Sequence, residues 1–312
     1  MISIPVASGS LEGFKHIFGN FNFIAVLLVL LIIVWISGRR EQVQHFKRVD
    51  KIPIRIHVNG IRGKSTVTRL IGGALRESGL KTITKTTGKG ARIIEPDGNE
   101  KPVARRGKPN IREQIEIMKI AVHEGIHALV IECMAVHPEL QRVAERKMIH
   151  STIGVITNVR TDHLDVMGPT LEDVARNLCN TIPRNGIVVT SEEKYLHIIE
   201  ERARKVGARI IKANPQEIDD ELIRSFSYLN FKENVAIALE ISRLLGIPDD
   251  LAIEGMLKAN PDPGVMTIYR PTLNGSEFMF VNAFGVNDKD STVTVYRELM
   301  NRGYFDKRAI VG

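Results

Sequence analysis

One short run of residues, Asn59-Gly60-Ile61-Arg62-Gly63-Lys64-Ser65-Thr66, has the composition and spacing to bind phosphate. It follows an apolar segment, Ile54 to Val58, that predicts a buried strand, and it leads into helical periodicity from Ser65 to Ser78. This context suits a phosphate-binding loop, because glycines let backbone N–H groups converge on phosphate oxygens at the start of a helix. The Lys64 ammonium can meet the β and γ phosphates, and the Ser65 hydroxyl can ligate Mg²⁺.

The candidate nucleotide contacts are Asn59, Gly60, Gly63, Lys64, Ser65 and Thr66. The alternative is a simple glycine turn with a solvated lysine. Glu132 follows a second buried strand, Ala128 to Ile131. A carboxylate at the carboxyl end of a strand beside the loop is where sheet geometry puts a metal ligand. His163, which stands in Asp162-His163-Leu164-Asp165, is by itself more simply a solvated loop residue.

The order of elements after residue 51 predicts the fold. Strands and helices alternate, and strand, helix, strand connections make neighbouring strands parallel. We therefore expect a doubly wound, mostly parallel α/β sheet. Asn110 and Glu113 are expected to form a helix capping box. The segment Lys81 to Arg112 is expected to be a glycine-containing loop in which Thr86-Thr87-Gly88 stands at the end of a predicted strand. The predicted strands are 54–58, 128–131, 152–156, 187–189 and 208–211. Five helices are predicted at 65–78, 138–146, 192–206, 232–245 and 249–259. Two more are predicted to begin after Asn110 and after Thr170.

Taken together, the loop and two later segments resemble the Mur ligase superfamily, whose members join amino acids to carboxylates. The loop matches the short G-x-x-G-K-S form, the strand ending at Glu132 looks like the family strand whose glutamate holds Mg²⁺, and Thr157 to Asp165 is similar to a T-N-x-x-x-D-H-L-D segment. The resemblance covers roughly residues 53–264. It implies catalytic roles for Lys64, Glu132 and His163, metal binding by Ser65, Glu132 and His163, and an adenine contact from Asn234, for which a helix-surface asparagine is the alternative.

Two positions depart from the superfamily pattern. Leu178 stands where many members carry a carbamylated lysine that bridges two metals, which implies that the second metal is held differently or less tightly. Val265 stands where an arginine often follows the linker glycine, so that contact to ATP is in doubt.

Within the superfamily, the chain is most similar to the ATP-dependent ligase subunit of poly-γ-glutamate synthases of the capsule type. An apolar N-terminus replaces the nucleotide-sugar domain of cell-wall ligases, and Asn282 to Thr292 is similar to the start of that subfamily's third domain. This implies that ATP and Mg²⁺ activate a γ-carboxylate as an acyl phosphate, to which glutamate is added. The segment Lys81 to Arg112, with nine basic and three acidic residues, either guides the anionic polymer or is merely solvated. The alternatives are a membrane ATPase coupled to export or assembly, and a nucleotide-binding module without turnover.

The first fifty residues predict a membrane anchor. The apolar run Phe23 to Ile36, extended by Ile17 to Phe21, is just long enough to cross a bilayer, and basic residues follow it. The positive-inside rule then places the remainder in the cytoplasm. A cleaved signal peptide and a buried core helix are the alternatives. Membership of a synthase also implies companion membrane subunits.

The whole chain of 312 residues divides into an anchor (1–50), an ATP-binding domain (51–264) and the start of a further α/β domain (265–312). The linker Asn260 to Gly264 cannot continue a helix. After it we expect strands at 265–269, 278–281 and 308–311 and a helix near 292–301, so the domain is incomplete, as a fragment or a natural truncation. An aromatic content of 5% is low for base-stacking modules, and no nucleic-acid partner is expected.

Overall fold

The computed structural model describes residues 9–88, 90–105, 107–262, 266–269, 272–273, 276–277, 280–282, 289–301 and 303. They belong to two compact units, Met1–Lys51 and Ile52–Gly312. The first unit contains helix α1 (Gly9–Val49). Within α1, Phe23–Val49 is long and apolar enough to cross a membrane, and no part of its apolar window is buried. That exposure disfavours a buried core helix.

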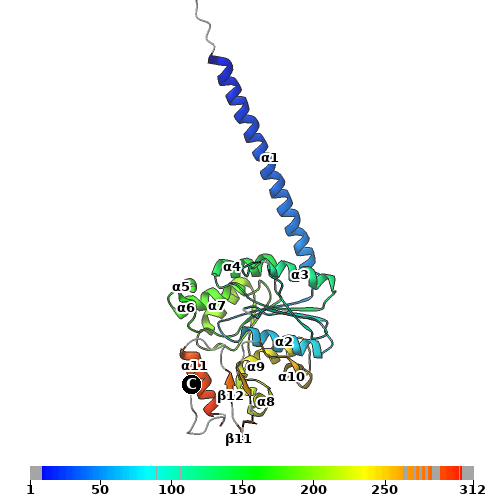
Figure 1. The fold of residues 1–312 in the computed structure, drawn as a ribbon, viewed down its shortest axis with the longest axis vertical. Helices are drawn as coiled ribbons and strands as arrows, with labels where there is room; N and C mark the ends of the chain where they lie inside the picture. Colours follow the sequence, from blue (N-terminus) through cyan, green and yellow to red (C-terminus); the bar gives the residue numbers. More distant parts are fainter. Residues whose placement is uncertain are drawn as a thin grey trace, which may run out of the picture. The chain divides into compact units, whose positions relative to one another are not determined.

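The second unit is built on an eight-stranded sheet with the order β4-β3-β2-β5-β1-β6-β7-β8 (Figure 1). The six strands β2, β5, β1, β6, β7 and β8 pair in parallel with their neighbours. Strands β3 and β4 add an antiparallel edge next to β2. In the register, Val58 pairs with Glu132 and Asn59 with Ile156, so the carboxyl ends of three central strands share one edge. The bounds are β1 Ile54–Asn59, β2 Thr82–Lys85, β3 Arg92–Ile94, β4 Glu100–Pro102, β5 Ala128–Glu132, β6 Ile153–Ile156, β7 Ile187–Thr190 and β8 Arg209–Lys212.

Helices cover both faces of this sheet, as a doubly wound fold requires (Figure 1). One face carries α2 (Lys64–Glu77), α8 (Asp220–Ser225), α9 (Lys232–Leu244) and α10 (Asp249–Lys258). The other carries α3 (Glu113–His123), α4 (Pro138–Val143), the π-helix η1 (Ala144–Ile149), α5 (Leu164–Met167), α6 (Leu171–Leu178) and α7 (Leu196–Val206). The predicted fold class is confirmed, and Thr170 caps α6 in a capping box with Asp173 as expected.

Three local predictions need correction. The segment Lys81 to Arg112 is not one loop: β2 agrees with the strand expected before Thr86, but the β3–β4 hairpin was not expected. The capping box expected at Asn110 and Glu113 forms only in half: Asn110 N donates to Glu113 Oε1 at 3.3 Å, but the Asn110 side chain accepts from Arg112 N and the helix begins at Glu113. The helix expected from Glu192 starts at Leu196, because the Glu192 carboxylate accepts backbone bonds from its own turn and from the neighbouring loop.

After residue 262 the described part of the chain forms short strands and one helix. They are β9 (Thr267–Tyr269), β10 (Thr272–Leu273), β11 (Ser276–Glu277), β12 (Phe280–Asn282) and α11 (Lys289–Asn301), and β12 pairs with β9. Several predictions lie outside the described residues. They are those at Gly264 and Val265, the strand 308–311, and the part of the Asn282 to Thr292 segment that covers residues 283–288.

Candidate nucleotide and metal site

The loop between β1 and α2 has a backbone that only glycine tolerates at two points. Gly60 has φ +135° and Gly63 has φ +78°, the left-handed region. A Cβ added to Gly60 would lie 2.0 Å from Thr157 Oγ1, and one added to Gly63 would lie 2.7 Å from Asn234 Oδ1. Both glycines are therefore required by conformation and by close neighbours.

The side chains of Lys64 and Ser65 contact different partners. Lys64 Nζ donates to the carbonyl oxygens of Gly60, at 2.9 Å, and Ile61, at 3.1 Å. Ser65 Oγ donates to Glu132 Oε2 at 2.9 Å, and the same oxygen accepts from Thr87 N at 2.8 Å. Glu132 is only 3% exposed. The ends of β1, β5 and β2 thus converge on one carboxylate.

Asn59 and Thr66, the other two candidate nucleotide contacts with polar side chains, are both at least partly buried. The Asn59 side chain is buried, and its amide nitrogen donates to Gln141, Thr181 and the Leu178 carbonyl. Because these bonds occupy the Asn59 side chain, a contact between Asn59 and a nucleotide would have to come from the Asn59 backbone. Thr66 is half-buried in the first turn of α2. Leu178, which the sequence comparison set against a lysine of other superfamily members, is fully buried in an apolar cluster.

The segment after β6 fastens the loop, a role that the residues' spacing did not reveal. Thr157 Oγ1 and Asn158 Nδ2 donate to the Arg62 carbonyl, at 2.7 Å and 3.0 Å, and Arg62 N donates to Asn158 Oδ1 at 3.0 Å. The Arg62 guanidinium also lies 3.5 Å from Asp162. Thr157 and Asn158 directly follow β6, which pairs in parallel with β1, so the sequence already indicated that they would lie beside the loop after β1.

His163 begins α5 with a left-handed backbone, φ 50°. Its imidazole lies 3.7 Å from Asp162 Oδ1, and the Asp162 carboxylate reaches toward Arg62. Within the described part of the chain, no hydrogen bond or ion pair joins His163 to Ser65 or Glu132. The structure therefore brings Ser65 and Glu132 into contact and leaves His163 linked to the loop through Asp162.

The donor set fits a hard cation. No group of three or more His, Cys, Asp or Glu side chains among the described residues is placed to hold a metal ion. Mg²⁺, however, is commonly bound through one or two protein oxygens, with phosphate and water completing its shell, and Ser65 and Glu132 supply such oxygens. The carboxylate of Asp262 is affected by the Glu132 charge. Burial raises the pKa of Asp262, the Arg69 guanidinium lowers it, and the negative charge of Glu132 raises it. Repulsion between these two carboxylates favours a nearby cation.

Asn234 lies beside the loop, although it is far away in sequence. It is 6% exposed in the first turn of α9, its Oδ1 faces Gly63, and its Nδ2 lies 3.3 Å from Asn230 Oδ1. The packing of α9 against α2 produces this proximity. A nucleotide on the loop would therefore pass close to Asn234.

A buried polar cluster supports β1 from the face covered by η1. His57 Nδ1 lies 2.8 Å from Glu145 Oε2, and the Glu145 carboxylate accepts bonds from Ser151 N and Oγ. Burial lowers the pKa of His57, but the side chains of Cys133 and Glu145 outweigh it and raise the pKa to about 9. At neutral pH the pair is therefore ionic and ties the strand that ends in the loop to η1.

Comparison with known proteins identifies the class. The model of the Mur ligase middle domain matches residues 58–243, and the chain belongs to the Mur ligase family. Among its relatives, PGA synthase CapB of Bacillus subtilis (strain 168) is 42% identical over 282 residues, which cover 89% of this chain and 72% of the relative. Capsule biosynthesis protein CapB of Bacillus anthracis is 43% identical over 295 residues, which cover 94% of this chain and 64% of that protein.

Solved structures show the same fold. An Escherichia coli FolC in complex with ADP superposes with a TM-score of 0.59 at 15% identity, covering 72% of this chain and 61% of that one. A bifunctional folylpolyglutamate synthase/dihydrofolate synthase with Mn, AMPPNP and L-glutamate bound gives a TM-score of 0.63 at 15% identity, covering 84% and 69%. At this level of identity the likeness concerns the fold alone.

Proposed function

We propose that this chain is an ATP-dependent carboxylate-amine ligase that adds glutamate to a growing poly-γ-glutamate chain. The observation that carries the proposal is the shared oxygen of Glu132, which joins the phosphate-loop serine to the ends of two other strands. Membership of the Mur ligase family and more than 40% identity to two CapB proteins support the same reaction.

The reaction must make a carboxylate oxygen into a leaving group. A γ-carboxylate oxygen of the acceptor bonds to the γ-phosphorus of ATP as the bond to the bridging oxygen breaks, and ADP leaves with that electron pair. The glutamate amine then bonds to the acyl carbon, the carbon–oxygen bond to phosphate breaks, and the amine proton passes to solvent. No protein nucleophile is needed for this sequence.

Each candidate residue has a task in this reaction. Bound Mg²⁺ supplies charge neutralisation for the phosphates, and Ser65 and Glu132 would hold it. Lys64 turns from the carbonyls of its own loop to the γ-phosphate and stabilises the charge that develops there. Asn234 contacts the adenosine end, and His163 serves a second metal.

Initial rates of ADP formation, with and without glutamate and polymer, test the proposal against its alternatives. A ligase forms ADP only when both the amino acid and an acceptor are present, and hydroxylamine traps an acyl hydroxamate. ADP formation that ignores glutamate would instead indicate an ATPase coupled to export or assembly. Nucleotide binding without any turnover would indicate a binding module.

The membrane assignment belongs to the same proposal. The apolar span Phe23–Val49 anchors the chain, the catalytic unit faces the cytoplasm, and companion membrane subunits complete the synthase. Retention of the full chain in carbonate-washed membranes is the expected result. Release into the soluble fraction would remove the anchor from the proposal.

A further inference from the structure

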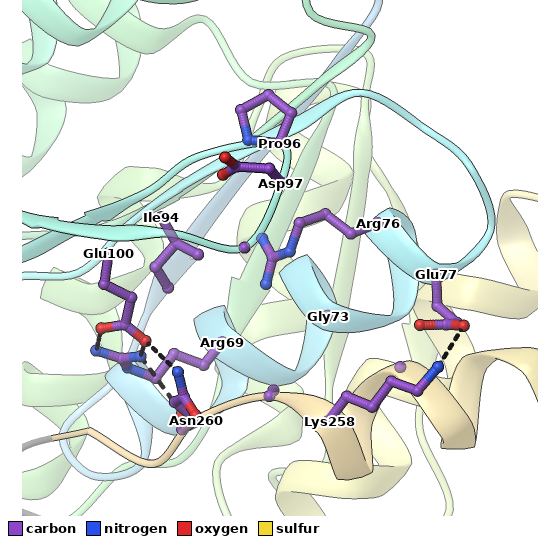
Figure 2. A pocket seen from close by; sticks show the side chains of 13 residues that line it. Arg69, Gly73, Arg76, Glu77, Ile94, Pro96, Asp97, Glu100, Lys258 and Asn260 are labelled. Carbon is purple, nitrogen blue, oxygen red and sulfur yellow. Dashed lines mark hydrogen bonds and ion pairs between the residues drawn. The ribbon is translucent and has the colours of Figure 1, made fainter.

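A cavity lies beside α2, away from the phosphate loop. It measures about 350 Å³ and is enclosed by α2, the β3–β4 hairpin and α10 (Figure 2). The two helices meet at Gly73 and Gly255, where a Cβ on Gly73 would lie 2.3 Å from the Gly255 carbonyl oxygen. This close approach brings the side chains of α2 and α10 around one hollow. Cavities of this size hold small ligands or single units of larger ones.

Two of the cations that line the cavity are each paired with carboxylates. Arg69, which is 1% exposed, holds Glu100 through two parallel hydrogen bonds, and Lys258 pairs with Glu77 (Figure 2). Asp97 is held by the backbone and side-chain nitrogens of Asn99, within its own turn. The remaining partners are Asp262, 3.4 Å from Arg69, and Glu254, 2.8 Å from Lys258.

Arg76 is the exception. Its guanidinium points into the cavity between the β3–β4 hairpin and Gly73 (Figure 2). Its hydrogen bond goes to the neutral hydroxyl of Thr84, at 3.0 Å, and no carboxylate of the described residues forms an ion pair with it. Burial lowers the pKa of Arg76 to about 10; Glu100 opposes this effect and Arg69 adds to it. A largely buried guanidinium without an acid is costly, and the fork still has N–H groups to offer.

We propose that this cavity is a carboxylate-binding subsite in which Arg76 holds a side carboxylate of the glutamyl acceptor chain. The Arg76 guanidinium, which has no carboxylate of the described residues at ion-pair distance, can hold a carboxylate through two parallel N–H groups. The proposal rests on the proposed ligase function, because it takes its ligand from that reaction.

The bound carboxylate is not the reacting one. Arg76 lies 11 residues after Ser65 on α2, which corresponds to roughly 16 Å at about 1.5 Å per residue. A group held there is too far from Ser65 and Glu132 to be phosphorylated. The subsite therefore anchors an earlier unit of the polymer while its end lies at the phosphate loop.

The test compares Arg76→Gln with a matched control, Arg204→Gln. Arg204 also lies in the last turn of a helix but is exposed, so its replacement removes the same charge without touching the cavity. Defined γ-linked glutamate oligomers, free glutamate and inorganic phosphate are each titrated against the full chain by thermal shift, without turnover, and the oligomer KM is measured with ATP.

Arg76→Gln should weaken oligomer binding and raise the oligomer KM by roughly ten- to a hundred-fold, the scale of one charge-assisted hydrogen bond. The value of kcat and the KM for free glutamate should change less than about two-fold. Arg76→Lys, which keeps the charge, should retain most of the affinity, and Arg204→Gln should match the wild type. Without ligand, Arg76→Gln should melt at the same or a higher temperature, because an unpaired buried charge is removed.

Three results would overturn the subsite. They are oligomer affinity unchanged in Arg76→Gln, a lower melting temperature of ligand-free Arg76→Gln with no rescue by lysine, and an Arg76-dependent shift produced by phosphate or free glutamate but not by oligomers. Its failure is separable from that of the ligase. ADP formation with an unchanged oligomer KM removes only the subsite, whereas Arg76-dependent oligomer binding without ADP formation removes only the ligase.

Discussion

Replacing Glu132 by glutamine isolates the charge at the proposed metal site. A single oxygen, Oε2, accepts both the Ser65 hydroxyl, at 2.9 Å, and the Thr87 N–H, at 2.8 Å. Glutamine has nearly the same volume and one amide oxygen that can keep both bonds. Stability should therefore hold, and relief of the repulsion with Asp262 works in the same direction. The lost charge should cost about 2.7–4 kcal/mol in the transition state, or about 10²–10³ in kcat.

The assay is the initial rate of ADP formation at saturating ATP, glutamate and acceptor, measured over a range of Mg²⁺ concentrations. Glu132→Gln should lower the rate and also raise the half-saturating Mg²⁺ concentration, while its melting temperature stays near that of the wild type. Glu193→Gln, at an exposed glutamate, is the control for charge alone. A Glu132→Gln protein with wild-type rate and Mg²⁺ dependence would refute the metal site.

Three further outcomes are expected. Lys64→Ala should lose at least two orders of magnitude in kcat with little change in melting temperature, because its ammonium contacts only carbonyls of its own loop. Gly63→Ala should cost about 1–2 kcal/mol from its positive φ and, by displacing Asn234, weaken nucleotide binding at least ten-fold in a fluorescent-nucleotide titration. The free energy of unfolding, measured by urea titration, should fall as the pH rises from 6.5 to about 9. The reason is that the pKa of His57 is about 9 in the folded protein and 6.5 in the unfolded chain, so the stabilisation is fully present below pH 6.5 and is lost as the pH rises through the folded pKa. Glu145→Gln should reduce that slope, and the Cys133 side chain keeps the remainder.

Each of these outcomes has a clear contrary result. An active Lys64→Ala protein would take that lysine out of the mechanism, and unchanged nucleotide affinity in Gly63→Ala would separate Asn234 from the nucleotide. Stability that is flat across the alkaline range in the wild type would mean that His57 and Glu145 are not an ion pair.

The central sheet could be predicted because its strands are buried on both faces. Strands such as Ile54–Asn59 and Ala128–Glu132 are mostly apolar, and such runs are typical of parallel strands. The β3–β4 hairpin could not be predicted in the same way. Arg92–Ile94 and Glu100–Pro102 are short, carry charges and lie at an exposed edge, where no continuous apolar run is required.

The nearness of Ser65 to Glu132 could be predicted for a geometric reason, since the carboxyl ends of adjacent parallel strands meet at one edge. The approach of Asn234 to Gly63 could not, because it depends on how α9 packs on α2, and only the family resemblance indicated it. Arg76 gave no signal, because an arginine in the last turn of a helix normally lies in solvent. Its burial follows from the Gly73 and Gly255 contact, which is a tertiary event.

The most direct measurement is a crystal structure of this chain with Mg²⁺ and a non-hydrolysable ATP analogue. We expect the metal at about 2.1 Å from Ser65 Oγ and from a Glu132 carboxylate oxygen, with the γ-phosphate beside the Lys64 ammonium. A nucleotide bound elsewhere, or a metal with neither of these oxygens among its ligands, would contradict the ligase assignment at its base.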